Sequence, residues 1–148
     1  MTVTHILDGP QSGWMKIYVV GNAAVVANQI GQVLNPEGVE LQITDGFLYC
    51  INDADSAATL DIGITVTSGA DDTDIASAID INGIAAGAVI YLIGKDAASE
   101  AAATTPKGVK WAAGSYMSFY NPAAFECATF EAYCYFRYIR IGEDVTRL

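Results

Sequence analysis

The chain has 148 residues, of which 52% are hydrophobic and only 16% are charged, and its formal net charge is −10. This length supports one domain with a sufficient hydrophobic core, so neither a disulfide framework nor a structural metal is required for stability. The acidic balance, with seven dispersed lysines and arginines, excludes a nucleic-acid partner, because a phosphate backbone would be repelled.

The low share of charged residues predicts that part of the surface is covered by a partner, because large apolar patches are rarely left in water. The alternative is that small alanine and glycine residues inflate the hydrophobic share. We expect synthesis in the cytosol, because residues 1–5 lack the basic segment and apolar run of a secretory signal. The longest weakly polar stretch, Gly83 to Gly94, is too short to span a membrane.

The first strand is predicted after an N-terminal segment. We expect residues 1–12 to form an arm and residues 13–148 to form a single β-sandwich domain. Trp14 to Val20 is rich in β-branched and aromatic residues, and Gly21-Asn22 is predicted to turn it into a hairpin with Ala23 to Ala27.

The middle of the chain predicts three more strands. Val39 to Thr44 and Phe47 to Ile51 flank Asp45-Gly46, a dipeptide favoured in tight turns, and indicate a second hairpin. From Thr59 to Thr67, apolar even positions alternate with small or polar odd positions, which is typical of a strand with one face in the core.

Helix is expected to be scarce. Asp74 to Asp80 is the best candidate, because Ile75 and Ile79 would lie on one helical face and Asp71, Asp72 or Thr73 could cap it. Ala97 to Thr105 is predicted to be either a helix or an exposed loop.

The second half of the chain returns to strands. Ala88 to Ile93 is apolar on both faces, which indicates a central strand. Gly108 to Ala113 and Ser115 to Tyr120 are predicted to pair around Gly114, and Ala128 to Ile141 alternates as a long closing strand. The predicted fold is therefore mainly β: an antiparallel β-sandwich of jelly-roll order with at most one or two short helices.

The sequence contains no convincing catalytic motif. His5 is the only histidine, the serines lack a nucleophile-elbow setting, and there is no phosphate-binding loop and no zinc spacing. Cys50, Cys127 and Cys134 lie in apolar runs and are predicted to be reduced core thiols. We therefore expect neither an enzyme nor a bound cofactor.

Two weaker binding hypotheses remain. Residues 52–56 and Asp71, Asp72 and Asp74 offer oxygens for calcium, although neither loop completes an EF-hand and both could simply solvate turns. The two tryptophans and eight tyrosines could stack on a sugar, but in alternating strands such residues are more often in the core or at interfaces.

Three short segments carry a resemblance. The opening Thr4-His5-Ile6-Leu7-Asp8-Gly9-Pro10, the strand Leu60-Asp61-Ile62-Gly63-Ile64-Thr65 with its following acidic turn, and the aromatic and basic strand from Phe130 to Ile141 resemble small virion structural proteins of tailed bacteriophages.

The resemblance implies a capsid decoration (cement) protein on the virion exterior. Such proteins are β-sandwiches, commonly homotrimers or dimers, that clamp the outer face of the major capsid protein lattice and stabilise the head. The alternative is a receptor- or glycan-binding domain of a head fibre or tail fibre. We expect residues 1–10 to contact the shell or a neighbouring subunit, and the candidate interface residues are Ile6, Leu7, Trp14, Trp111, Tyr133 and Tyr135.

Overall fold

The computed structural model describes residues 12–93 and 108–141, which form nine β-strands. All pairs of named strands are antiparallel. Within these ranges no helix is long and apolar enough to cross a membrane. The strands are β1 (Ser12–Val20), β2 (Asn28–Leu34), β3 (Leu41–Asn52), β4 (Thr59–Thr65), β5 (Ala76–Asp80), β6 (Val89–Tyr91), β7 (Val109–Trp111), β8 (Tyr116–Asn121) and β9 (Glu131–Arg140).

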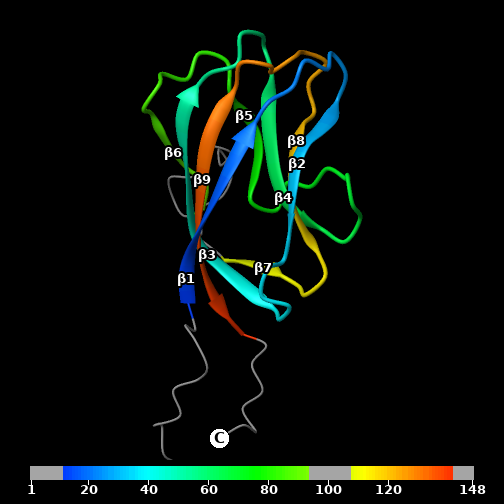
Figure 1. Ribbon diagram of the computed structural model, residues 1–148, viewed down its shortest axis with the longest axis vertical. Coiled ribbons are helices and arrows are strands. Elements are labelled where there is room, and N and C mark those ends of the chain that lie inside the picture. The colour runs from blue at the N-terminus through cyan, green and yellow to red at the C-terminus, as the bar shows by residue number, and fades with distance from the viewer. Residues whose placement is uncertain (1–11, 94–107, 142–148) are drawn as a thin grey trace, which may run out of the picture.

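The strands form two sheets that pack against each other (Figure 1). The five-stranded sheet has the order β1-β9-β3-β6, with β7 also paired to β3, and the four-stranded sheet has the order β2-β8-β4-β5. Four strand pairs are nested along the chain, as in a long antiparallel ribbon rolled into a sandwich. From the innermost to the outermost they are β4 with β5, β3 with β6, β2 with β8 and β1 with β9. This is a jelly-roll order, so the predicted fold class is confirmed.

The core lies between the two sheets. Side chains that point inward from β3 and β9, such as Leu48 and Phe136, are fully buried and belong to one cluster with Leu60 and Phe119 of the four-stranded sheet. Burial of each large apolar side chain stabilises the fold by about 1.5–3 kcal/mol. The strand predictions from Thr59 and from Ala128 are confirmed as β4 and β9.

The three cysteines are buried and free, as predicted. Burial raises the pKa of the Cys134 thiol far above its usual range, and burial together with Asp53 raises that of Cys50. Thiols held in the protonated state are poor nucleophiles, so both belong to the core rather than to a reactive site.

The hairpin predicted for residues 14–27 is wrong. β1 pairs with β9, residues 23–27 form no strand, and the chain crosses to the other sheet before β2 begins. Gly21 marks this crossing, because a Cβ placed on it would lie 1.8 Å from the carbonyl oxygen of Cys127. The glycine is required for close packing and not for a two-residue turn.

The hairpin predicted at Asp45-Gly46 is also wrong, because β3 runs through it as one strand of 12 residues. The register with β9 shifts between Ile43 and Asp45, which is a bulge. A Cβ on Gly46 would lie 2.7 Å from the ring of Phe136. Here again glycine allows close packing, and the local turn signal is overridden.

The helix predicted from Asp74 to Asp80 is wrong, because this segment contains β5. Ile75 and Ile79 are both buried, but a spacing of four places residues on one side of a strand as well as of a helix. Pairing with β4 decides in favour of the strand.

Two predictions for later strands need correction. β6 pairs only with β3 among the described residues and exposes Val89 and Tyr91, so it lies at an edge and is not a central strand. β7 pairs with β3 whereas β8 pairs with β2 and β4, so the segments around Gly114 belong to different sheets. Residues 97–105 and nearly all of the predicted arm lie outside the described residues, and the division into arm and domain stays a prediction.

Candidate functional site

The most distinctive surface is the outer side of the five-stranded sheet. Alternation along each strand sends one set of side chains into the core and the other set outward. We call most of this outward set the aromatic face, and Gln42 of β3 and Ile139 of β9 lie outward beyond it. The face consists of Trp14, Lys16, Tyr18 and Val20 on β1, Glu131, Tyr133, Tyr135 and Arg137 on β9, Asp45, Phe47, Tyr49 and Asn52 on β3, and Val89 and Tyr91 on β6.

The strand register arranges the centre of the aromatic face as two rows that cross four strands. One row is Lys16, Tyr135, Phe47 and Tyr91. The other row is Tyr18, Tyr133, Tyr49 and Val89. β1 and β6, in which the rows begin and end, both lie at edges of this strand order, so the rows span the sheet outside β7.

The rings of these rows pack against one another. Phe47 and Tyr135 stack with centroids 4.8 Å apart and planes 18° apart. Trp14 meets Phe47 edge-on at 5.9 Å, and Tyr18 lies 5.5 Å from Tyr133. Each such pair contributes about 0.5–1.5 kcal/mol beyond burial, so the rings hold a defined surface before any partner arrives.

A large part of this surface nevertheless remains in contact with solvent. Trp14 and Tyr18 are each 54% exposed, and Tyr91 is 53% exposed. Exposed apolar patches of this kind on soluble proteins mark interaction sites. The aromatic face is therefore the candidate functional site.

The two cations of the aromatic face, Lys16 and Arg137, form no ion pair with a described residue, whereas Lys110 and Arg140 do. Lys110 pairs with Glu40 at 3.5 Å, and Arg140 pairs with Glu37. Lys16 instead places its Nζ 3.8 Å from the centre of the Tyr133 ring, which is a cation–π contact, and Arg137 is exposed with no ion pair to a described residue.

Glu131 begins β9, and Arg137 lies on the same strand at the other side of the aromatic face. Asn52 donates a weak hydrogen bond of 3.4 Å from its Nδ2 to Oε2 of Glu131. Partial desolvation and then the neighbouring Glu131 raise the pKa of Tyr18, which places the phenol beside this carboxylate. Along β9, the aromatic face thus has a carboxylate at one side and a guanidinium at the other.

The structure brings three of the predicted interface residues together. Trp14, Tyr133 and Tyr135 all lie on the aromatic face. Trp111 is fully buried, and its Nε1 donates a 3.1 Å hydrogen bond to the carbonyl oxygen of Ser115, so its side chain belongs to the core of this chain. Ile6 and Leu7 lie outside the described residues.

The sequence reasoning did not name Lys16, Tyr18, Phe47, Tyr49 and Tyr91 as interface residues. Phe47 and Tyr49 would have been found by treating β3 as one strand, since their alternation with buried Leu48 sends them outward. Tyr91 was assigned to a strand buried on both sides. Lys16 shows no sequence signal beyond its alternation with the apolar residues of β1.

The calcium candidates form a different arrangement. The backbone N–H of Asp74 donates to Oδ1 of Asp72, which is a local turn contact. Asp71 faces the buried carboxyl group of Asp61, and burial followed by Asp61 raises the pKa of Asp71 to about 6. In residues 12–93 and 108–141, no group of three histidine, cysteine or acidic residues is placed to hold a metal ion.

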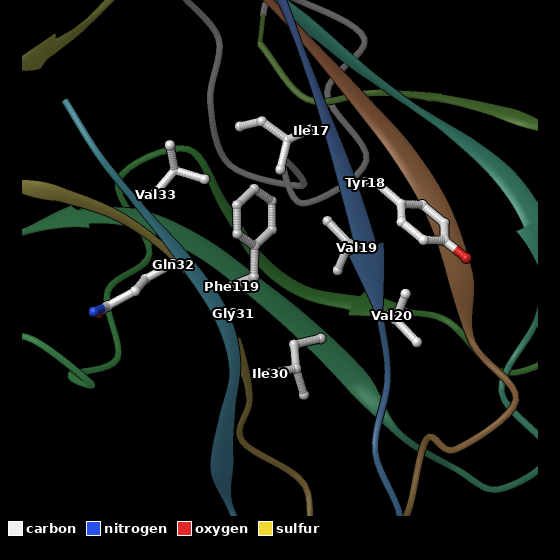
Figure 2. A pocket seen from close by; sticks show the side chains of 9 residues that line it. All are labelled: Ile17, Tyr18, Val19, Val20, Ile30, Gly31, Gln32, Val33 and Phe119. Atoms are coloured by element: carbon white, nitrogen blue, oxygen red, sulfur yellow. The ribbon is translucent and has the colours of Figure 1, made fainter. Parts of the chain in front are cut away.

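A small cavity of about 100 Å³ opens between β1 and β2. Figure 2 shows Ile17, Val19, Ile30 and Phe119 gathered around it, whereas Tyr18 points away. Ligand pockets usually have volumes of about 300 Å³ or more, so this cavity is a gap in packing between two edge strands.

No protein-family model, curated protein or solved structure matches this chain. The account of the site therefore rests on the physical chemistry of its own residues.

Proposed function

We propose that this chain is a bacteriophage capsid decoration protein, which binds the outer surface of the major capsid protein lattice and stabilises the head. The aromatic face is the single observation that carries the assembly role. The resemblance of residues 4–10, 60–65 and 130–141 to small phage virion proteins supports the choice of the capsid as the setting.

The composition of the aromatic face suits a protein partner. Interfaces are enriched in tyrosine, tryptophan and arginine and depleted in lysine and acidic residues at their centres. The two central rows contain five tyrosines and one phenylalanine, with Lys16 as their one charged residue. The carboxylates and the guanidinium lie in the flanking rows, as in a polar rim.

Decoration would act through thermodynamic linkage. A subunit that binds only the assembled lattice stabilises that lattice by its free energy of binding. At a thousandfold excess over the dissociation constant this amounts to about 4 kcal/mol per site, and it is repeated over many copies. The net charge of −10 would keep the decorated particle soluble and would favour a basic patch on the shell.

A receptor- or glycan-binding fibre domain is the second candidate. It is favoured by Trp14, Tyr18 and Tyr91, which are about half exposed on one sheet face and could stack on sugars. The ring contacts at the centre of the aromatic face argue against sugar stacking there. Phe47 and Tyr135 stack on each other, and Lys16 covers one face of Tyr133, so these rings are already occupied.

The test is a quantitative protein inventory of purified virions of the source phage. The proposal predicts a copy number comparable to that of the major capsid protein, and heads that lose thermal stability when the protein is stripped and regain it when the protein is added back. A few copies per virion would support the fibre domain, and absence from virions would overturn the proposal.

The shell contact is expected from residues 1–10, which lie outside the described residues. A variant without residues 1–10 should keep its far-UV circular dichroism spectrum but sediment with heads less than the full chain does. If this variant binds heads as well as the full chain does, residues 1–10 do not make the shell contact.

A further inference from the structure

We infer that the aromatic face binds a second copy of this chain, with the two sheets packed face to face about a two-fold axis. The inference rests on the proposed function, since it names the partner of the same surface. The order of residues along β9 and across its neighbouring strands makes this face complementary to itself.

On the aromatic face the outward residues of β9 read, in order, Glu131, Tyr133, Tyr135 and Arg137, and the next outward residue, Ile139, lies beyond the face. This order is self-complementary. A two-fold axis that lies between the sheets and perpendicular to the strands reverses the strand direction, so β9 of one copy faces β9 of the other. Glu131 then faces Arg137 of the second copy, and Tyr133 faces Tyr135, each contact occurring twice as an isologous interface requires.

The two central rows obey the same operation. The axis places the row that begins with Lys16 opposite the row that begins with Tyr18 in the second copy. Lys16 then faces the ring of Tyr18, which gives a cation–π pair. On β3 the same axis places Phe47 opposite Tyr49, which gives an aromatic pair.

The flanking rows are complementary as well. Trp14, Arg137 and Asp45 are in register at one end of the face, and Val20, Glu131 and Asn52 are in register at the other. The axis places Trp14 against Val20, Arg137 against Glu131 and Asp45 against Asn52. Each opposed pair is apolar, oppositely charged or hydrogen-bonding. Packed sheets cross at about 30°, so the contacts nearest β9 are the best preserved.

The charge of the molecule favours this face for self-association. The whole chain carries −10, so most pairs of surfaces would repel each other. The aromatic face instead has Lys16 and Arg137 to balance Glu131 and Asp45. It is therefore a part of the surface on which two copies can meet without a net repulsion.

The consequence for stoichiometry is specific. An isologous contact closes on itself and gives a dimer, whereas a trimer requires two different patches that meet head to tail. The inferred contact therefore favours the dimer over the homotrimer.

Charge reversal provides the test. The full chain at concentrations well above micromolar should sediment as a dimer, with twice the monomer mass of 15.6 kDa. Arg137→Glu and Glu131→Arg, each alone, should weaken the dimer about a hundredfold, because like charges then meet twice in each interface. The double variant, with both reversals, should recover the dimer, since the opposed charges are again opposite. Asp80→Arg, which reverses an exposed charge on β5 of the four-stranded sheet, should leave the dimer intact.

A wild-type monomer, a trimer, or a double variant that stays as weak as the single variants would overturn the inference. Co-sedimentation with heads, measured in parallel on the wild-type chain, is a separate readout. Failure to bind heads would contradict the capsid role, whereas the stoichiometry alone decides the dimer.

Discussion

On both outer faces of the sandwich, alternate residues of each strand point outward, but the outward residues of β4 are buried on one face and many outward residues are exposed on the other. On the four-stranded sheet, the outward positions of β4 are Asp61, Gly63 and Thr65, and all three are buried because residues 66–75 fold back over them. On the five-stranded sheet, many outward positions are aromatic, and Trp14, Tyr18 and Tyr91 remain about half exposed.

The difference shows how each face obtains its cover. The cover of the four-stranded sheet is built from this chain: Ser118 donates a 2.7 Å hydrogen bond to the carbonyl oxygen of Ala70, and the backbone of Asp72 lies directly over Gly63. No comparable hydrogen bonds are made over the aromatic face by the described residues. We propose that its cover comes from a partner.

The largest expected effect comes from disturbing the internal cover. In the variant Gly63→Ala, the added Cβ would lie 2.4 Å from the backbone of Asp72, so residues 66–75 must move and the free energy of unfolding should fall by about 2–3 kcal/mol. Gly31→Ala on β2 is the matched control, since nothing lies within 4 Å of its added Cβ, and it should change stability by less than about 0.5 kcal/mol. Urea denaturation measures both, and equal effects would contradict the account of the cover.

The aromatic face should show the opposite behaviour, with a smaller effect on folding and a clear effect on association. Trp14→Ala removes a ring that is 54% exposed and packs edge-on against Phe47, so it should lower stability by about 1–2 kcal/mol, less than Gly63→Ala does, while weakening self-association about tenfold. Phe125→Ala, at a 50% exposed ring in the β8–β9 connection, is the control and should leave association unchanged. Analytical ultracentrifugation gives the comparison, and equal association of both variants would argue against the face.

A smaller effect is expected from the carboxyl pair beneath the internal cover. Burial and Asp61 raise the pKa of Asp71 to about 6, above its ordinary value of 3.8. A raised pKa means that this group stabilises the fold below about pH 4 and that the contribution is lost as the pH rises through about 6.

Asp71→Asn should therefore be more stable than the wild type at pH 7.5 and should lose that advantage near pH 4. Because Asp71 is largely exposed, solvent screening limits the gain to about 1 kcal/mol or less. Asp72→Asn is the control, because its Oδ1 can still accept the N–H of Asp74. Thermal melts across this pH range check the prediction, and a gain that does not vary with pH would contradict it.

The smallest effect is expected at Lys16. Lys16→Gln removes the ammonium group that lies 3.8 Å from the Tyr133 ring centre and should lower stability by about 0.5–1 kcal/mol. Lys110→Gln breaks an exposed ion pair and should cost less than about 0.5 kcal/mol. Urea denaturation at low and high salt separates the two, and an equal loss would remove the cation–π contact from the account.

Local sequence patterns predicted where the strands lie better than they predicted which strands pair with each other. Alternation found β4 and β9 and the inward and outward residues of β9, including Tyr133 and Tyr135. The first predicted hairpin was wrong because a jelly roll pairs strands that are far apart in sequence, such as β1 with β9, and the second was wrong because β3 continues through a bulge. Gly21 and Gly46 have the sequence signature of turns, but their role depends on Cys127 and Phe136, which pack against them only in the folded sandwich.

The candidate site could also be predicted only in part, because alternation identifies outward residues but not neighbouring strands. Trp14, Tyr133 and Tyr135 could be named from strand alternation, but nothing in the sequence states which strands are neighbours. The rows of the aromatic face, and with them the roles of Phe47, Tyr91 and Lys16, depend on the register across β1, β9, β3 and β6. These strands are far apart in the sequence, so which of their residues lie side by side is determined only by the complete fold.

Oxidative footprinting of aromatic residues tests the central claim most directly. The labelling of Trp14, Tyr18 and Tyr91 should be high in dilute protein and should fall strongly in concentrated protein and in protein bound to heads, whereas buried Trp111 should stay unlabelled throughout. If Trp14, Tyr18 and Tyr91 are labelled equally in all three samples, the aromatic face is not covered by a partner and the account is contradicted.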